Sequence, residues 1–169
     1  MKHSTRSDRG LTRHVVAWCW AGAALIGGQA HAQNVQYAPG KVIFDSKCVV
    51  CHQAGGKGQD GLAPPLIELP GRYAAHDEGR QQLTMTVLNG MFGAITVDSK
   101  TYNFKMPSFK AMSDEDLADV LNYVVFDLNA KHDGAKPFTA ADVKAMRASP
   151  MDGAKVREHR DVALKSIGS

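Results

Sequence analysis

Cysteine is scarce in this chain, with three residues among 169. So low and odd a number excludes the disulfide frameworks that stabilise many small exported domains. Cys19 stands apart from the other two, Cys48 and Cys51, which are separated by only two residues. The positions of the cysteines are therefore more informative than their number.

Long apolar runs are also missing. The apolar stretch at residues 15–28 is shorter than the roughly 20 residues that a membrane-spanning helix needs. With 44% hydrophobic and 22% charged residues, the composition is that of one globular domain. A disordered tail protein, a collagen-like repeat and a multi-span membrane protein are excluded.

The net charge of +3 is small, and it comes wholly from the first 32 residues. That segment holds Lys2, Arg6, Arg9 and Arg13 against the single acid Asp8. The remaining 137 residues carry as many acidic as basic side chains. Because a nucleic-acid-binding surface needs clustered positive charge, the sequence predicts no nucleic-acid partner.

The first 32 residues have the pattern of an export signal. A basic stretch precedes the apolar run, and the small-residue site Ala30-His31-Ala32 follows it. We expect residues 1–32 to be a cleaved signal peptide and the mature protein to begin near Gln33, in the periplasm. An uncleaved membrane anchor remains the alternative.

The rest of the chain reads as helices joined by loops. Apolar periodicity and capping residues predict helices over 39–51, 79–89, 113–129 and 140–148. Glycine and proline at many positions of 53–71 predict a long loop. A turn at Asp98-Ser99 suggests a short hairpin or extended loop within 94–104. Residues 133–169 are interpreted as a partly helical and mobile C-terminal extension.

Residues 48–52 form a C-x-x-C-H string, the attachment motif of c-type haem. Near a helix end, Cys48 and Cys51 can bond the two vinyl groups of one porphyrin, and His52 can then ligate the iron. Zinc binding lacks a second cysteine pair, and a redox dithiol lacks the usual strand-then-helix context, but both remain alternatives.

A haem iron has a sixth position, and methionine is a common ligand there. Met85 and Met91 fall in apolar stretches and are interpreted as core residues, and Met112 as structural. Met106 lies in an irregular segment, and Pro107 restricts its backbone to extended conformations. That restraint suits a sulfur held toward a metal.

Between Gly40 and Leu128 the chain resembles the class I c-type cytochromes. The resemblance rests on a spacing of glycine, phenylalanine and cysteine at 40, 44 and 48, on the haem motif, on residues 63–66 (APPL), 105–109 (KMPSF) and 117–124. It implies that Met106 is the distal ligand opposite His52. It further implies that the Pro64 carbonyl accepts a hydrogen bond from His52 and that Tyr102 reaches a haem propionate.

The resemblance implies an all-α cytochrome c fold over residues 33–132, with three to four main helices around one covalently bound haem c. Helices near both ends of that domain should cross, with Gly40 and Phe44 packing against Val120 and Tyr123. Glycines of related small bacterial cytochromes are replaced here by Ser99 and Phe104, so the loop before Met106 departs from the pattern. The expected apolar lining of the haem is Ile67, Leu69, Val87, Leu88, Phe109 and Leu121.

With both axial positions filled, the implied function is electron transfer rather than enzymatic catalysis. The implied partners are a periplasmic dehydrogenase, a reductase or an oxidase, with the membrane reached only through them. Two alternatives stay open: an obligate subunit of a dehydrogenase complex that docks through residues 133–169, and a haem sensor or enzyme with a labile Met106. Four lysines either form a docking rim or are ordinary solvated residues: Lys47, Lys57, Lys105 and Lys110.

Overall fold

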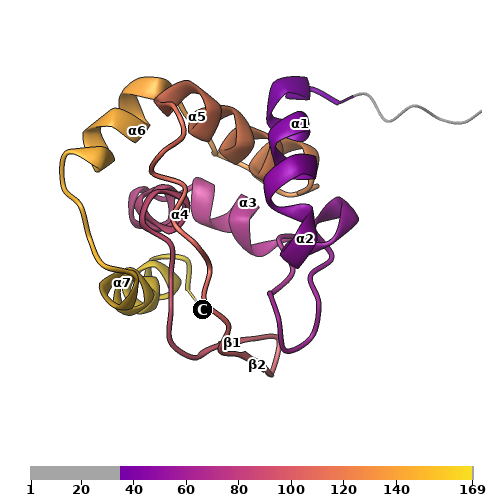
Figure 1. Ribbon diagram of the computed structural model, residues 1–169, viewed down its shortest axis with the longest axis vertical. Helices are drawn as coiled ribbons and strands as arrows, with labels where there is room; N and C mark the ends of the chain where they lie inside the picture. The colour runs from indigo at the N-terminus through magenta and orange to yellow at the C-terminus, as the bar shows by residue number, and fades with distance from the viewer. Residues whose placement is uncertain (1–34, 169) are drawn as a thin grey trace, which may run out of the picture. The chain divides into compact units, whose positions relative to one another are not determined.

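The computed structural model describes residues 35–168, so the expected signal peptide lies outside the described residues. Within this range the chain is mostly helical, with one small antiparallel sheet (Figure 1). This agrees with the all-α cytochrome c fold. The α-helices are α1 (Ala38–Lys47), α2 (Val49–His52), α3 (Leu69–Ala74), α4 (Asp77–Asn89), α5 (Asp114–Asn122), α6 (Ala140–Arg147) and α7 (Gly153–Ser166).

Helices α1 and α5 cross in close contact, as the resemblance to the class I c-type cytochromes implies. A Cβ atom at Gly40 would lie 2.0 Å from the Asp119 carbonyl oxygen, so only glycine permits this approach. One turn later Phe44 is fully buried, with its ring centroid 5.4 Å from that of Tyr123. Val120 completes this cluster. The crossing fixes the direction in which α1 delivers the following residues.

The continuous helix expected over 39–51 is instead two helices. Cys48 separates α1 from α2 with φ −109° and ψ −33°, although its N–H still donates to the Phe44 carbonyl at 2.8 Å. The short α2 then ends at His52, because the φ of 60° at Gln53 is incompatible with a helix. The break redirects the chain between the two cysteines.

The segment 53–71 is only partly the loop that the sequence predicts. It contains the 3₁₀ helix η1 (Ala54–Gly56), and Gly58 turns back so tightly that a Cβ atom there would lie 2.5 Å from the Pro65 nitrogen. Its last residues, however, begin helix α3. Pro70 lies in the first turn of α3, where a missing N–H costs nothing, so the predicted loop was wrong for residues 69–71.

Helix α4 begins two residues before its predicted start and ends as predicted at Gly90, which has φ +73°. The hairpin is confirmed as β1 (Ile95–Val97) paired with β2 (Lys100–Tyr102), with Ile95 opposite Tyr102. Asp98 and Ser99 have φ values of 50° and 63° in the turn. This positive φ at both central residues matches the twist that tight hairpins require.

Helix α5 begins at the predicted cap, where the Ser113 hydroxyl accepts a hydrogen bond from the Asp116 N–H at 3.0 Å. Its last turn widens into the π-helix η2 (Tyr123–Asp127). Leu117, Leu121 and Val125 point into a core that also contains residues of α3, α4 and α6. The apolar stripe read from the sequence is therefore the core-facing side of α5.

The C-terminal extension is more ordered than the sequence indicates. The predicted helix at 140–148 is α6, with a complete capping box between Thr139 and Asp142. Helix α7 was not predicted, yet it packs against α4 (Figure 1) and fully buries Val156 and Ala163. The division into a cytochrome c domain at 33–132 and an extension at 133–169 stays a prediction. The contacts between α7 and α4 join the two segments.

None of the helices in residues 35–168 is both long and apolar enough to span a bilayer.

Candidate haem site

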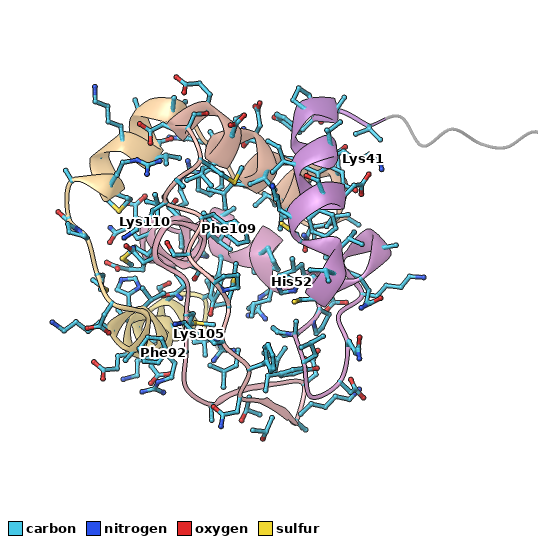
Figure 2. The ribbon with its side chains drawn as sticks, viewed as in Figure 1. Lys41, His52, Phe92, Lys105, Phe109 and Lys110 are labelled. Atoms are coloured by element: carbon cyan, nitrogen blue, oxygen red, sulfur yellow. The ribbon has the colours of Figure 1, made fainter. Side chains whose placement is uncertain are left out.

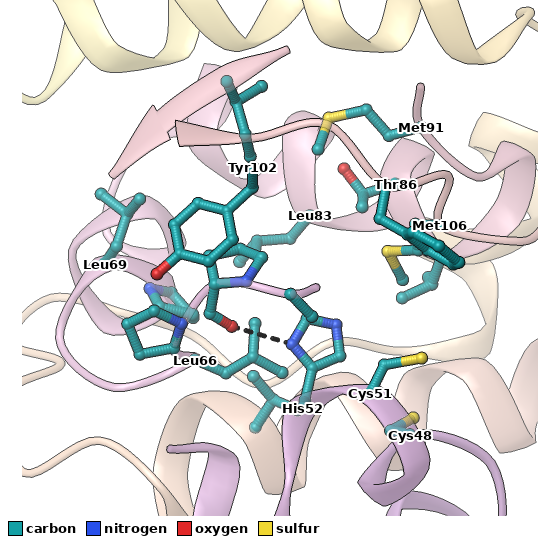
Figure 3. Close-up of a pocket in the computed structure, with 18 of the residues that line it drawn as sticks. Cys48, Cys51, His52, Leu66, Leu69, Leu83, Thr86, Met91, Tyr102 and Met106 are labelled. Carbon is teal, nitrogen blue, oxygen red and sulfur yellow. Dashed lines mark hydrogen bonds between the residues drawn. The ribbon is translucent and has the colours of Figure 1, made fainter. Parts of the chain in front are cut away.

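One cavity lies among α2, α3, α4, the hairpin and the segment that carries Met106 (Figure 3). Its walls are mainly aliphatic and aromatic side chains, with a few polar groups at separate points. Such a cavity can enclose a large flat apolar group and fix its orientation at a small number of polar contacts.

Cys48 and Cys51 lie together on one side of this cavity, and both thiols are free (Figure 3). Burial raises the pKa of Cys48 to about 11, and the neighbouring Cys51 adds to this effect. Since α2 begins between the two residues, the helical turn presents both sulfurs to the same wall. This arrangement suits two covalent attachments to one edge of a planar group.

His52 follows the cysteines and its ring faces the cavity. Its Nδ1 lies 3.0 Å from the carbonyl oxygen of Pro64. Burial lowers the pKa of His52, and the hydrogen bond to Pro64 opposes that effect. Because a carbonyl can only accept, Nδ1 carries the proton and Nε2 keeps a lone pair. The imidazole is thereby prepared to bind a metal through Nε2.

Met106 reaches the cavity on the side facing His52 (Figure 3). Its backbone forms two hydrogen bonds with Met91, of 2.9 and 3.1 Å. A Cβ atom at Gly90 would lie 2.5 Å from the Met106 carbonyl oxygen, so glycine allows this close pairing. The restraint expected from Pro107 is thus joined by a second one that the sequence did not indicate.

Met91 also lines the cavity, although the sequence analysis placed it in the core. Its sulfur lies 3.9 Å from the side-chain nitrogen of Gln82. The cavity therefore contains two thioethers, of which the Met91 sulfur already has a polar contact. Hydrophobic periodicity could not distinguish a core methionine from one at a cavity wall.

Tyr102 lies at the end of the cavity away from the two thiols (Figure 3). The polar residues that line the cavity also include Tyr73 of α3 and Arg160 of α7. Both are more than nine-tenths buried, and sequence analysis identified neither of them. No local motif could have done so, because they come from helices that the sequence did not predict.

Comparison with known proteins agrees with this geometry. The family model described as cytochrome c matches residues 37–125. The chain belongs to the cytochrome c family. It is similar to two cytochromes c-552 of Thermus thermophilus, one 38% identical over 83% of this chain and 94% of the relative, the other 37% identical over 76% and 99%. It also resembles subunit CcoP of a cbb3-type cytochrome c oxidase from Cereibacter sphaeroides, 26% identical over 98% of this chain and 59% of that protein.

This cytochrome therefore has covalently bound haem c as its cofactor and serves as an electron carrier. The residues of the cavity fit that cofactor. Two thiols lie on one wall, an imidazole and a thioether face each other, and apolar side chains surround them. In residues 35–168 no three His, Cys, Asp or Glu side chains cluster as metal ligands, so the zinc alternative lacks a ligand set.

The apolar lining of the cytochrome was predicted in part. Leu69, Val87, Phe109 and Leu121 line the cavity. Ile67 and Leu88 do not: Ile67 is 40% exposed, and Leu88 points into the core between α4 and α5. Val87 and Leu88 are neighbours on one helix and face different directions, which the sequence analysis did not resolve.

Two of the four candidate rim lysines of the cytochrome, Lys47 and Lys105, line the mouth of the cavity. The Nζ atom of Lys105 lies 5.7 Å from the ring centroid of Phe92. Lys57 and Lys110 are exposed and line no part of the cavity. Figure 2 shows Lys110 apart from Lys105, near the end of the segment leading to α5. Any basic rim is therefore smaller than proximity in sequence suggests.

Proposed function

We propose that this cytochrome carries single electrons between redox proteins in the periplasm, with Cys48 and Cys51 bonded to the haem and His52 and Met106 as axial ligands. The bound cofactor supplies an iron that cycles between ferrous and ferric states. The polypeptide holds the ligands, excludes water and sets the relative stability of the two states. The arrangement of His52 and Met106 on facing sides of one apolar cavity carries the proposal.

The ligand environment favours electron transfer. A methionine sulfur stabilises ferrous iron, and an apolar surrounding penalises the additional positive charge of the ferric state. The hydrogen bond from His52 Nδ1 to Pro64 fixes the ring orientation and increases the basicity of Nε2. We further propose that Tyr102, at the far end of the cavity, donates to a haem propionate.

Separate observations support the proposed location and the proposed partners. The first 32 residues have the pattern of a cleavable export signal, which supports the periplasm. At the mouth of the cavity, exposed Val50 and Phe104 lie beside Lys47 and Lys105. An apolar centre with positive charges around it suits brief docking to an acidic redox partner, which we propose to be a dehydrogenase, reductase or oxidase.

The C-terminal extension bears on the alternative function as a complex subunit. A tail reserved for a partner would leave its apolar residues exposed until docking. Here Phe138, Val143, Val156 and Ala163 are buried within the cytochrome itself. The extension therefore has a structural role that needs no partner, which favours a freely diffusing carrier.

The proposed ligation is tested by comparing Met106→Leu with Met91→Leu. Both substitutions remove a thioether from the same cavity and keep its apolar character. Met106→Leu should abolish the charge-transfer band from sulfur to ferric iron and lower the reduction potential, because ferrous iron loses its soft ligand. Met91→Leu should retain the band.

Visible absorption and voltammetry of both purified variants give the answer. A band that survives in Met106→Leu and disappears in Met91→Leu would assign the ligand to Met91. A band lost in neither variant would mean that no methionine of the cavity binds the iron. Either result would remove the basis of the proposed ligation.

A further inference from the structure

Arg160 of helix α7 is a buried cation with no carboxylate partner among residues 35–168. Its exposed fraction is 8%, and its guanidinium donates to the backbone carbonyl of Thr96 at 3.0 Å. No carboxylate of residues 35–168 forms an ion pair with it, whereas Arg147 pairs with Asp114 at 2.7 Å. A guanidinium removed from water is costly unless an opposite charge compensates it.

Tyr73 presents a second unsatisfied polar group at the same cavity. Its side chain is 4% exposed, and its hydroxyl has no hydrogen-bond partner within the described part of the chain. Burial raises the pKa of Tyr73, and the positive charge of Arg160 is the strongest influence that opposes this rise. Arg160 and Tyr73 both line this cavity.

Arg160 lies near Tyr102, and Tyr73 lines the same cavity. Thr96, which accepts the hydrogen bond from Arg160, is the neighbour of Ile95, and Ile95 pairs with Tyr102 across the hairpin. In haem the propionates are on the porphyrin edge opposite the vinyl groups. The thiols of Cys48 and Cys51 lie on the other side of the cavity from Tyr102 (Figure 3). The Arg160 guanidinium is thus near the end of the cavity where an anion is expected.

We propose that Arg160 and Tyr73 bind a haem propionate and that Arg160 raises the reduction potential of the cytochrome. The carboxylate would accept hydrogen bonds from the remaining guanidinium N–H groups and from the tyrosine hydroxyl, which satisfies both buried groups. The cation offsets the negative charge of the propionate, which would otherwise stabilise ferric iron. The C-terminal helix thereby contributes to redox function as well as to packing.

The test separates this electrostatic role from a purely structural one. Arg160→Gln removes the charge but keeps a donor for the Thr96 carbonyl, and Arg160→Met removes both. Lys165→Met deletes a cation from an exposed position of the same helix. Tyr73→Phe removes only the hydroxyl. The holoprotein of each variant is studied by voltammetry, visible absorption and thermal unfolding.

Arg160→Gln and Arg160→Met should both lower the potential, and Lys165→Met should not. A unit charge in a medium of effective dielectric constant about 20 changes the ferric-to-ferrous ratio roughly tenfold at about 10 Å, which is about 59 mV for one electron. Tyr73→Phe should shift the potential in the same direction by a smaller amount.

A wild-type potential in Arg160→Gln would overturn the proposal and leave Arg160 as a tether between α7 and the hairpin. An equal shift in Lys165→Met would also overturn it, because the effect would then follow total charge. If neither Arg160 variant folds, an unchanged potential in Tyr73→Phe refutes the propionate contact. The interpretation of the reduction potentials rests on the proposed ligation by His52 and Met106. A sulfur-to-iron charge-transfer band that is retained in each variant shows that this ligation is intact.

Discussion

Replacing Val156 by alanine tests whether helix α7 is an integral part of the folded cytochrome. Val156 is fully buried against the rest of the protein, whereas Val162, six residues later on the same helix, is 49% exposed. Val156→Ala removes two buried methyl groups at about 0.8 kcal/mol each and leaves a cavity, for a total of about 2–3 kcal/mol. Val162→Ala makes the same chemical change at the surface and should cost below about 0.5 kcal/mol.

Thermal unfolding of the two holoproteins, followed by circular dichroism, measures the difference. For a chain of this size the melting temperature of Val156→Ala should fall by about 4–12 °C, and that of Val162→Ala by about 2 °C or less. Both variants exchange the same residue types in one helix, so the difference in helix propensity cancels. Equal melting temperatures would show that α7 does not contribute to global stability and would refute its docking against α4.

Sequence analysis located the elements whose ends carry specific chemical signals. Ser113 and Thr139 cap α5 and α6 with their own side chains, and Gly90 ends α4 with a positive φ. Helix α7 also has a side-chain cap, Asp152, but its buried residues include Arg160, which gives no apolar signal. The buried face of α7 could be recognised only once its packing against α4 was known.

The candidate site was predictable to the extent that it is local in sequence. The two cysteines and the histidine form one contiguous motif, and Pro107 distinguishes Met106 from other methionines. Tyr73 and Arg160 lie 87 residues apart and meet only because α3 and α7 face the same cavity. No spacing rule within the sequence encodes that meeting.

Two further substitutions test the packing around the site by chemical unfolding. Gly40→Ala should destabilise the protein by about 1–3 kcal/mol despite the better helix propensity of alanine, because its Cβ would overlap the Asp119 carbonyl, and the exposed Ser46→Ala in the same helix should be nearly neutral. A stabilised Gly40→Ala would contradict the observed crossing of α1 and α5. Asn122→Ala should cost about 2–4 kcal/mol, since it leaves the buried N–H and carbonyl of Phe138 without their side-chain partners at 2.7 and 2.9 Å, while Asn103→Ala at the surface should have little effect. Equal effects of the two asparagine variants would argue against anchoring of the extension at Phe138.

Hydrogen bonds connect the C-terminal helix α7 to two parts of the haem cavity, the pair of methionines on one side and the hairpin with Tyr102 at one end. His159 contacts the Gln82 side-chain oxygen at 2.9 Å, and the nitrogen of the same amide lies 3.9 Å from the sulfur of Met91, the backbone partner of Met106. The next residue of the helix, Arg160, bonds to the hairpin that carries Tyr102. Because consecutive residues of α7 make these two connections, a displacement of this helix would disturb the methionine side and the tyrosine end of the cavity together. A substitution that loosens the packing of α7 should therefore change both the free energy of unfolding and the reduction potential of this cytochrome. Removal of the Arg160 charge alone should change mainly the reduction potential.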